Sequence, residues 1–189
     1  MLNSEPSHFD ELYAASPDPW GYHLSWYEQR RFALLGAMLH KPTYERGFEP
    51  GCANGTLTSA LALRCTTLEA WDGCLEAAQL TSSAVVQHPH VSVCHSSVPT
   101  HWPTGLFDLI VLSDFLYYLP PVDIHQVLVQ TAGSAQSGCM VLAGHWRGLA
   151  DDFATAGGDA VHTILIDVLG PPNVGHYCDT DQLISGWTL

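Results

Sequence analysis

The chain has 189 residues, of which 47% are hydrophobic and only 13% are charged. A chain of this length can bury roughly 70% of the surface that its unfolded form exposes, so it needs no disulfide or metal to fold, and its composition excludes a disordered protein. Six Lys and Arg against 19 Asp and Glu give a formal net charge of -13. Such a surface repels phosphate backbones and anionic lipids. We expect no nucleic-acid or membrane partner, and a cationic ligand is favoured instead.

Cysteine and histidine usage gives no sign of a disulfide framework or a metal site. The 6 cysteines form no Cys-x-x-Cys pair, which is typical of buried free thiols in a reducing compartment. Residues 1–5 lack the basic start and apolar run of a secretory signal, and no stretch approaches about 20 apolar residues. We therefore expect a cytoplasmic protein. The histidines show no clean ligand spacing except the pair His88 and His90, so we expect no metal.

The first 43 residues predict a helical cover: a short helix, a proline-rich break at residues 16–19, and a longer helix over 26–39. From residue 44, short apolar runs alternate with helical segments. The predicted strands are 47–49, 67–71, 91–94, 107–112 and 139–143. The predicted helices are 57–64, 75–86, 123–135 and 159–169. Strands separated by helices of this length indicate right-handed crossovers and a parallel sheet.

Two further short strands, at 176–178 and 183–187, could form an antiparallel hairpin at the sheet edge. We therefore predict a single α/β domain over residues 1–189, with a helical cover over 1–43 and a Rossmann-like core over 44–189. Its sheet is doubly wound and mostly parallel, with about seven strands and helices on both faces.

The segment from Glu49 to Gly55 lies where the first strand meets the first helix. Small residues there let the backbone approach a ligand at the carboxyl end of the sheet. The spacing Gly51-x-x-x-Gly55 differs from the Gly-x-Gly-x-x-Gly of dinucleotide folds, and no P-loop signature follows, so phosphate binding is disfavoured. An ordinary strand-to-helix turn is the alternative interpretation.

Two other strand ends carry candidate ligand groups. Asp72 ends the second strand about 20 residues after the glycine loop, where a carboxylate can accept both hydroxyls of a ribose; the alternative is an Asp favoured by a helix dipole. Ser113 and Asp114 end a buried strand and could place a proton acceptor, whereas Tyr117 and Tyr118 could line an acceptor pocket or simply pack.

These residues together resemble class I methyltransferases, and in particular the nodulation protein S (NodS) family. The resemblance is carried by the glycine loop with Glu49, the Asp72 strand end, residues 102–119, and the run His145-Trp146-Arg147. Residues 18–31 and 158–162 also match the family pattern, and coverage runs from about residue 9 to the last residue. The resemblance implies S-adenosylmethionine as cofactor and S-adenosylhomocysteine as product. It also implies N-methylation of a free amine on a partly deacetylated chitooligosaccharide or a related amino sugar.

The implied site follows residue by residue. The expected cofactor-binding residues are Glu49, Gly51, Cys52, Ala53, Gly55, Asp72, Gly73, Ser97, Val98, Ser113, Trp20 and Arg31. The expected acceptor-binding residues are Tyr117, Tyr118, Tyr27 and Trp146. Trp20, Tyr27 and Arg31 could fold over a bound cofactor or sugar, or could equally pack the leading helices. Asp114 and His145 are the candidate proton acceptors, because an amine must lose its proton before it attacks a methyl carbon; a core histidine is the alternative for His145.

Two departures from the family pattern bear on the site. Ser97 stands where relatives tend to carry Asp, so the contact to the adenine amine would be weaker. Asp114 stands where Glu is commoner, which moves the carboxylate back by about one methylene. Two alternatives stay open: a non-catalytic cofactor-binding protein with the same fold, and a small-molecule O-methyltransferase. The glycine spacing argues against a third, a nucleotide-dependent oxidoreductase.

Overall fold

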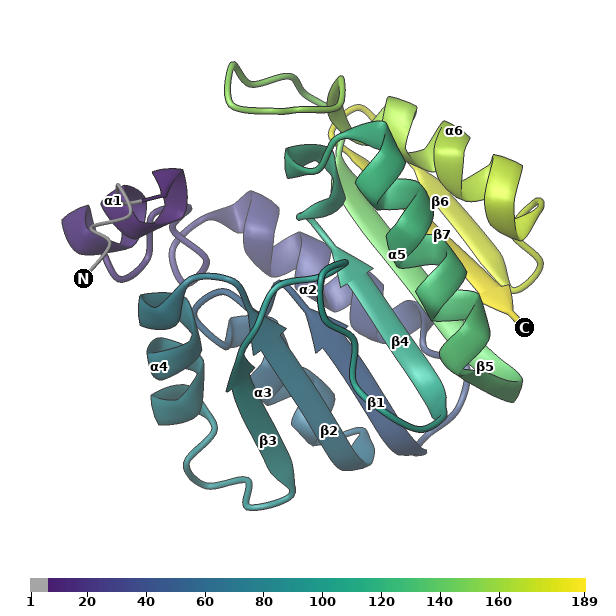
Figure 1. Cartoon of the computed structure of the whole chain (residues 1–189), viewed down its shortest axis with the longest axis horizontal. Helices are drawn as coiled ribbons and strands as arrows, with labels where there is room; N and C mark the ends of the chain where they lie inside the picture. The colour runs from purple at the N-terminus through teal and green to yellow at the C-terminus, as the bar shows by residue number, and fades with distance from the viewer. Residues whose placement is uncertain (1–6) are drawn as a thin grey trace.

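A seven-stranded sheet runs through the computed structural model, which describes residues 7–189 (Figure 1). The strands are β1 (Tyr44–Pro50), β2 (Cys65–Asp72), β3 (Val91–His95), β4 (Phe107–Ser113), β5 (Ala135–Trp146), β6 (Gly175–Cys178) and β7 (Gln182–Thr188). Their order in the sheet is β3-β2-β1-β4-β5-β7-β6. Neighbours among β1 to β5 are parallel, whereas β7 is antiparallel to both β5 and β6. The predicted mostly parallel sheet and its edge hairpin are confirmed.

Helices cover both faces of this sheet, as predicted. The helices are α1 (His8–Ala15), α2 (Trp26–Met38), α3 (Thr56–Ala62), α4 (Leu75–Ala84), α5 (Pro121–Ser134) and α6 (Gly157–Leu169), with a 3-10 turn η1 (Leu116–Tyr118) after β4. In Figure 1, α5 and α6 lie in front of the sheet, and α2 and α3 lie behind it. Strand β4 is buried along its whole length. Its residues 109–112 are a continuous apolar run, as is typical of strands covered on both faces, and the buried carboxylate of Asp108 accepts hydrogen bonds from the backbone N–H groups of Glu45 and Arg46.

The two faces of β4 contribute to two separate hydrophobic clusters. Ile110 and Leu112 pack with residues of α5 and α6, whereas Leu109 and Val111 pack with residues of α2 and α3. This alternation follows from the two-residue period of a strand. Leu35 of α2 belongs to the second cluster, so the longer helix of the cover is part of the core.

Helix α1 lies apart from the sheet and rests on α4. The hydroxyl of Ser7 accepts a hydrogen bond from the backbone N–H of Asp10, and the Asp10 carboxylate accepts one from the Ser7 N–H, so the helix begins with a capping box. Its buried residue Tyr13 packs with Cys74 and Ala77. Helix α1 is thereby held at the end of the sheet where β1, β2 and β4 finish (Figure 1).

Some boundaries differ from the sequence prediction. Strand β1 begins at Tyr44, three residues earlier than predicted. The backbone of this segment pairs with β2, but the polar residues Glu45 and Arg46 interrupt the apolar pattern from which the strand was predicted. Strand β5 extends to Trp146 because it pairs with β7 along that length. All 6 cysteines are free, with Cys178 exposed. Among residues 7–189 no helix is long and apolar enough to cross a membrane, and no cluster of three or more metal-binding side chains occurs.

Candidate active site

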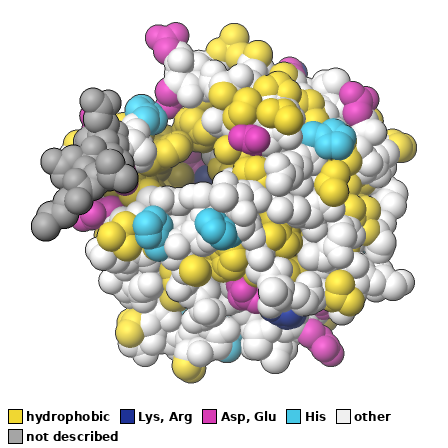
Figure 2. Space-filling model, in the orientation of Figure 1, with side chains coloured by type: hydrophobic (Ala, Val, Ile, Leu, Met, Phe, Trp, Pro, Cys, Tyr) yellow, Lys and Arg dark blue, Asp and Glu magenta, His cyan; other side chains and the backbone are white. Residues whose placement is uncertain are grey.

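A cavity of about 320 Å³ opens at the carboxyl ends of β1 to β4. Figure 2 shows the hollow, bordered by hydrophobic side chains. Helix α1 and the segment between α1 and α2 form its outer wall. Each strand end contributes predicted ligand groups to its lining: Gly51 and Ala53, Asp72 and Gly73, Ser97 and Val98, and Ser113 and Asp114. The cavity therefore lies where open α/β sheets bind ligands.

The two glycines of the loop after β1, Gly51 and Gly55, have different structural roles. Gly51 has a φ of +74°, and a Cβ added to it would lie 3.0 Å from Phe115, so it allows two loops to pass closely beside the cavity. Gly55 has a φ of +83°, and its Cβ would lie 2.9 Å from the backbone Cα of Thr81 in α4. Gly51 lines the cavity, whereas Gly55 lies outside its lining and serves helix packing.

Asp72 is fixed by the backbone on both of its oxygens. The Ala53 N–H donates to Oδ2 and the Cys74 N–H donates to Oδ1, each at 2.9 Å. Burial raises the pKa of Asp72 despite these bonds. Each carboxylate oxygen keeps a further acceptor position. Asp72 is therefore a rigid acceptor in the lining of the cavity.

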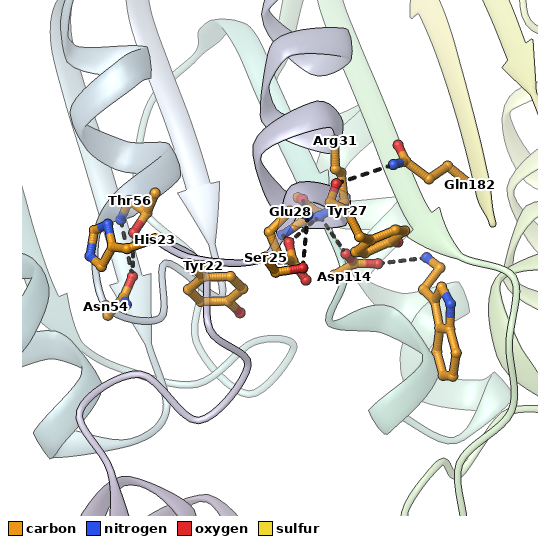
Figure 3. A network of polar contacts seen from close by, with 12 residues as sticks. Tyr22, His23, Ser25, Tyr27, Glu28, Arg31, Asn54, Thr56, Asp114 and Gln182 are labelled. Atoms are coloured by element: carbon orange, nitrogen blue, oxygen red, sulfur yellow. Dashed lines mark hydrogen bonds and ion pairs between the residues drawn. The ribbon is translucent and has the colours of Figure 1, made fainter.

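Behind the cavity, the side chain of Arg31 connects the first turns of α2 with the end of β4 (Figure 3). Its guanidinium forms ion pairs with Glu28 at 2.6 Å and Asp114 at 2.9 Å, and it donates to Ser113 Oγ at 2.5 Å. Burial alone would lower the pKa of Arg31, but the carboxylates of Asp114 and Glu28 outweigh it, and the pKa is raised. Burial also raises the pKa of Glu28. Two carboxylates share one guanidinium, so this wall carries a negative excess.

Asp114 has little freedom in this network. It is a non-glycine residue with a φ of +50°, a conformation that costs free energy and tends to occur at functional sites. Its Oδ1 accepts a hydrogen bond from the Trp146 N–H at 2.7 Å, and its Oδ2 faces the Arg31 guanidinium. The carboxylate lines the cavity as a fixed negative charge. Both of its oxygens are already engaged, which makes it a weak candidate for taking a proton.

His145 lies away from the cavity. It is only 1% exposed and does not belong to the lining. Its Nδ1 lies 3.2 Å from His162 Nε2, and its ring packs edge-on against Tyr117, with ring centroids 5.6 Å apart. Burial lowers the pKa of His145 to about 3, so the ring is neutral at pH 7. The structure therefore places His145 in the core, which was the alternative interpretation of this residue.

A smaller space of about 20 Å³ adjoins the cavity and is reached by three other predicted residues: Glu49, Cys52 and Arg31. It is large enough for about one water molecule. Glu49 is 2% exposed, and its Oε2 has no hydrogen-bond partner among the described residues. Burial raises the pKa of Glu49 to about 8, so its carboxyl is largely protonated at neutral pH.

The predicted aromatic residues divide between the cavity and its surroundings. Trp20, Tyr117 and Tyr118 line the cavity, whereas Tyr27 and Trp146 do not. Sequence reasoning missed Phe9, Tyr13 and Tyr22 on the outer wall, and Phe115 after β4, which also line the cavity. The spacing of Phe9 and Tyr13 on one face of a short helix was an available signal. The rings of Phe9 and Tyr118 meet edge-on across the cavity, with centroids 4.9 Å apart.

The family model described as nodulation protein S matches residues 9–137. The chain belongs to the nodulation protein S family. It is 32% identical over 123 residues to nodulation protein S of Bradyrhizobium diazoefficiens, a match that covers 65% of this chain and 59% of that protein. Its match to nodulation protein S of Rhizobium tropici is 35% identical over 106 residues and covers 56% and 44%. The chain thus spans less than two thirds of the length of these curated relatives.

Solved structures of the family and its neighbours share the fold. The N-methyltransferase NodS from Bradyrhizobium japonicum WM9, in complex with S-adenosylhomocysteine, is 25% identical with a TM-score of 0.83, covering 94% of this chain and 95% of that one. A protein from Pseudomonas syringae assigned as a methyltransferase is 35% identical with a TM-score of 0.78, covering 87% and 100%. The fold of this nodulation protein S family member is that of the class I methyltransferases.

Proposed function

We propose that this nodulation protein S family member is a single-domain methyltransferase that binds S-adenosylmethionine in the cavity and methylates a small amine. The acceptor is an amino sugar, such as a partly deacetylated chitooligosaccharide. One observation carries the proposal: Asp72, held on both oxygens by backbone N–H groups, faces a cavity of about 320 Å³ beside the glycine loop. The family membership and the S-adenosylhomocysteine bound to NodS support it.

The lining suits the parts of such a cofactor in order. Asp72 would accept the ribose hydroxyls, and Gly51 and Ala53 would allow the methionine part to lie against the backbone. Ser97 and Val98 would border the purine on the outer side of Asp72. We assign no cofactor contact to Gly55, because it packs on α4.

Charge supports the same orientation. S-adenosylmethionine, when bound, supplies an electrophilic methyl group on a positively charged sulfur. Glu28 and Asp114 outnumber Arg31 on the neighbouring wall, so a cation there is stabilised by a nearby negative excess. Tyr117 and Tyr118 can hold a neutral amine in line with the methyl carbon at about 3 to 3.5 Å, and the aromatic wall can exclude water.

In the proposed transfer, the acceptor nitrogen would form a C–N bond as the C–S bond of the cofactor breaks, and it would then carry one proton too many. Asp114 has both oxygens engaged, so in this proposal it stabilises that ammonium as a fixed charge, and the proton passes to water. His145 is buried away from the cavity and takes no part in this step.

Calorimetric titration with S-adenosylhomocysteine tests the cofactor site. Asp72→Ala removes both acceptors and should weaken binding at least tenfold, since hydrogen bonds to a charged group contribute about 1.5 to 3 kcal/mol. Asp167→Ala, an exposed position on α6, is the matched control and should leave binding unchanged. Circular dichroism verifies that each variant is folded. A folded native chain that does not bind S-adenosylhomocysteine would refute the proposal.

Transfer of a labelled methyl group tests the acceptor. A chitooligosaccharide with one free amine should become labelled on nitrogen, and the fully N-acetylated oligosaccharide should not. Mass spectrometry of the product locates the methyl group. Labelling of the fully acetylated sugar on oxygen would replace N-methylation by O-methylation.

A further inference from the structure

The outer end of the cavity, beyond Asp72, is built from two adjacent turns. Asp72 ends β2 and pairs with His95, which ends the neighbouring parallel strand β3. Gly73 follows the first strand and residues 96–98 follow the second, and all of them line the cavity. A purine attached to a ribose held by Asp72 has this corner within reach.

Ser97 presents an exposed hydroxyl in this corner. A Cβ added to Gly73 would lie only 2.7 Å from Ser97 Oγ, so the hydroxyl sits directly over the residue that follows Asp72. The backbone carbonyl of Ser97 accepts a hydrogen bond from His101 N–H at 2.9 Å, which fixes the turn through its backbone. The hydroxyl is thus placed by the fold and available to a ligand.

The character of the polar groups changes along the cavity. Glu28 and Asp114 line the cavity beside Arg31, and Asp72 lines it at the end of β2. The turns after β2 and β3 add the side chains of Cys74, Ser96 and Ser97 to the lining, and Ser7 and Tyr13 line it from the α1 side. A carboxylate only accepts hydrogen bonds, whereas a hydroxyl both donates and accepts. Apart from Asp72, the hydrogen-bonding side chains of the lining around the two turns are therefore hydroxyls and a thiol, which impose no fixed donor or acceptor pattern on the base.

The difference between a carboxylate, which only accepts hydrogen bonds, and a hydroxyl affects which purine can bind. A 6-aminopurine offers a donor at its 6-substituent and an acceptor at N1, whereas a 6-oxopurine offers an acceptor and a donor at the same places. We propose that the cavity accepts 6-oxopurine nucleoside thioethers as well as the adenine form, and that Ser97 is the residue that sets this tolerance. The inference rests on the function proposed above.

Calorimetric titration of the full chain with S-adenosylhomocysteine and S-inosylhomocysteine tests it. For the native chain, the two dissociation constants should agree within about threefold, because a hydroxyl can satisfy either 6-substituent. Ser97→Asp should favour S-adenosylhomocysteine over S-inosylhomocysteine by about 10- to 100-fold, because a carboxylate accepts from an amine and repels a carbonyl oxygen. Ser92→Asp, exposed on β3 and outside the cavity, is the matched control and should leave the ratio unchanged.

The outcomes separate the two proposals. If the native chain binds S-adenosylhomocysteine and disfavours S-inosylhomocysteine by more than about threefold, the tolerance is refuted and the cofactor site stands. If both ligands bind but Ser97→Asp leaves their ratio unchanged, the base does not contact Ser97 and the assignment of that residue fails. If neither ligand binds the folded chain, the proposed function fails and the inference fails with it.

Discussion

The buried histidine pair on the α6 side of the sheet predicts a measurable acid sensitivity. His145 and His162 are 1% and 2% exposed and lie 3.2 Å apart, and His162 Nδ1 lies 3.1 Å from Ser185 Oγ. Burial lowers the pKa of His145 to about 3 and that of His162 to about 2. Both rings are therefore neutral in the folded chain over the whole range from pH 7 to pH 5.

The sign and size of the effect follow from linkage. An unfolded histidine titrates near pH 6.5, so below that pH the unfolded chain binds protons that the folded chain does not. Stability from this source is complete above pH 6.5 and is lost as the pH falls towards the folded pKa values. At pH 5, each histidine lies about 1.5 units below its unfolded pKa, which costs about 2 kcal/mol at 1.36 kcal/mol per unit. For His145 and His162 together, the loss is about 4 kcal/mol.

Urea unfolding at pH 7 and pH 5 measures this loss. The free energy of unfolding should fall by about 2 kcal/mol less in His145→Gln and in His162→Asn than in the native chain, because each variant has one fewer buried histidine to charge. His101→Gln, at an exposed position, is the control and should follow the native chain. If all four proteins lose the same free energy between the two pH values, the histidine reasoning is wrong.

Three further predictions concern the loop, the buried acid and the outer wall. Gly55→Ala should destabilise the fold by about 1 to 3 kcal/mol in urea unfolding, because its Cβ would meet the Thr81 backbone at a positive φ. The pKa of Glu49 is near 4.5 in the unfolded chain and is raised to about 8 in the folded chain. Protonation of Glu49 therefore favours the folded state, and this contribution to stability is complete below pH 4.5 and is lost as the pH rises to 8. Between pH 5 and pH 7, the unfolding free energy of Glu49→Gln should therefore change by about 3 kcal/mol in the stabilising direction relative to that of the native chain. Phe9→Ala removes the ring packed edge-on against Tyr118 and should weaken S-adenosylhomocysteine binding about 3- to 10-fold in calorimetry.

The sheet could be predicted from the sequence because its central strands are short apolar runs between helical segments. Strand β4 is the clearest case, since burial on both faces accompanies the apolar run over residues 109–112. The polar start of β1 at Tyr44 could not be found in this way, because backbone pairing with Cys65 of β2 defines it. Periodicity reports burial, and it misses strand ends whose side chains are partly exposed.

The candidate site was predictable where it follows the backbone topology. Asp72 and Gly51 lie at strand ends that a parallel sheet must bring together. His145 also lies near the end of a parallel strand, β5. Its side chain packs against His162 of α6 and does not line the cavity, and the sequence alone does not reveal that orientation. Phe9 was missed because the contact of α1 with the cavity depends on how the proline-rich connection folds back.

On the proposed function, the distribution of charge explains how one cavity can hold a reactive cofactor and release its product. Burial raises the pKa values of Glu28 and Asp72, which means that keeping these two carboxylates ionised in the cavity wall costs free energy. A cation that enters the cavity offsets that cost by stabilising the ionised carboxylates. On the proposed function, methyl transfer converts a positively charged sulfonium into a neutral thioether while Asp114 stays fixed by Trp146 N–H. The electrostatic attraction for the cofactor therefore falls in the step that makes the product, which favours dissociation.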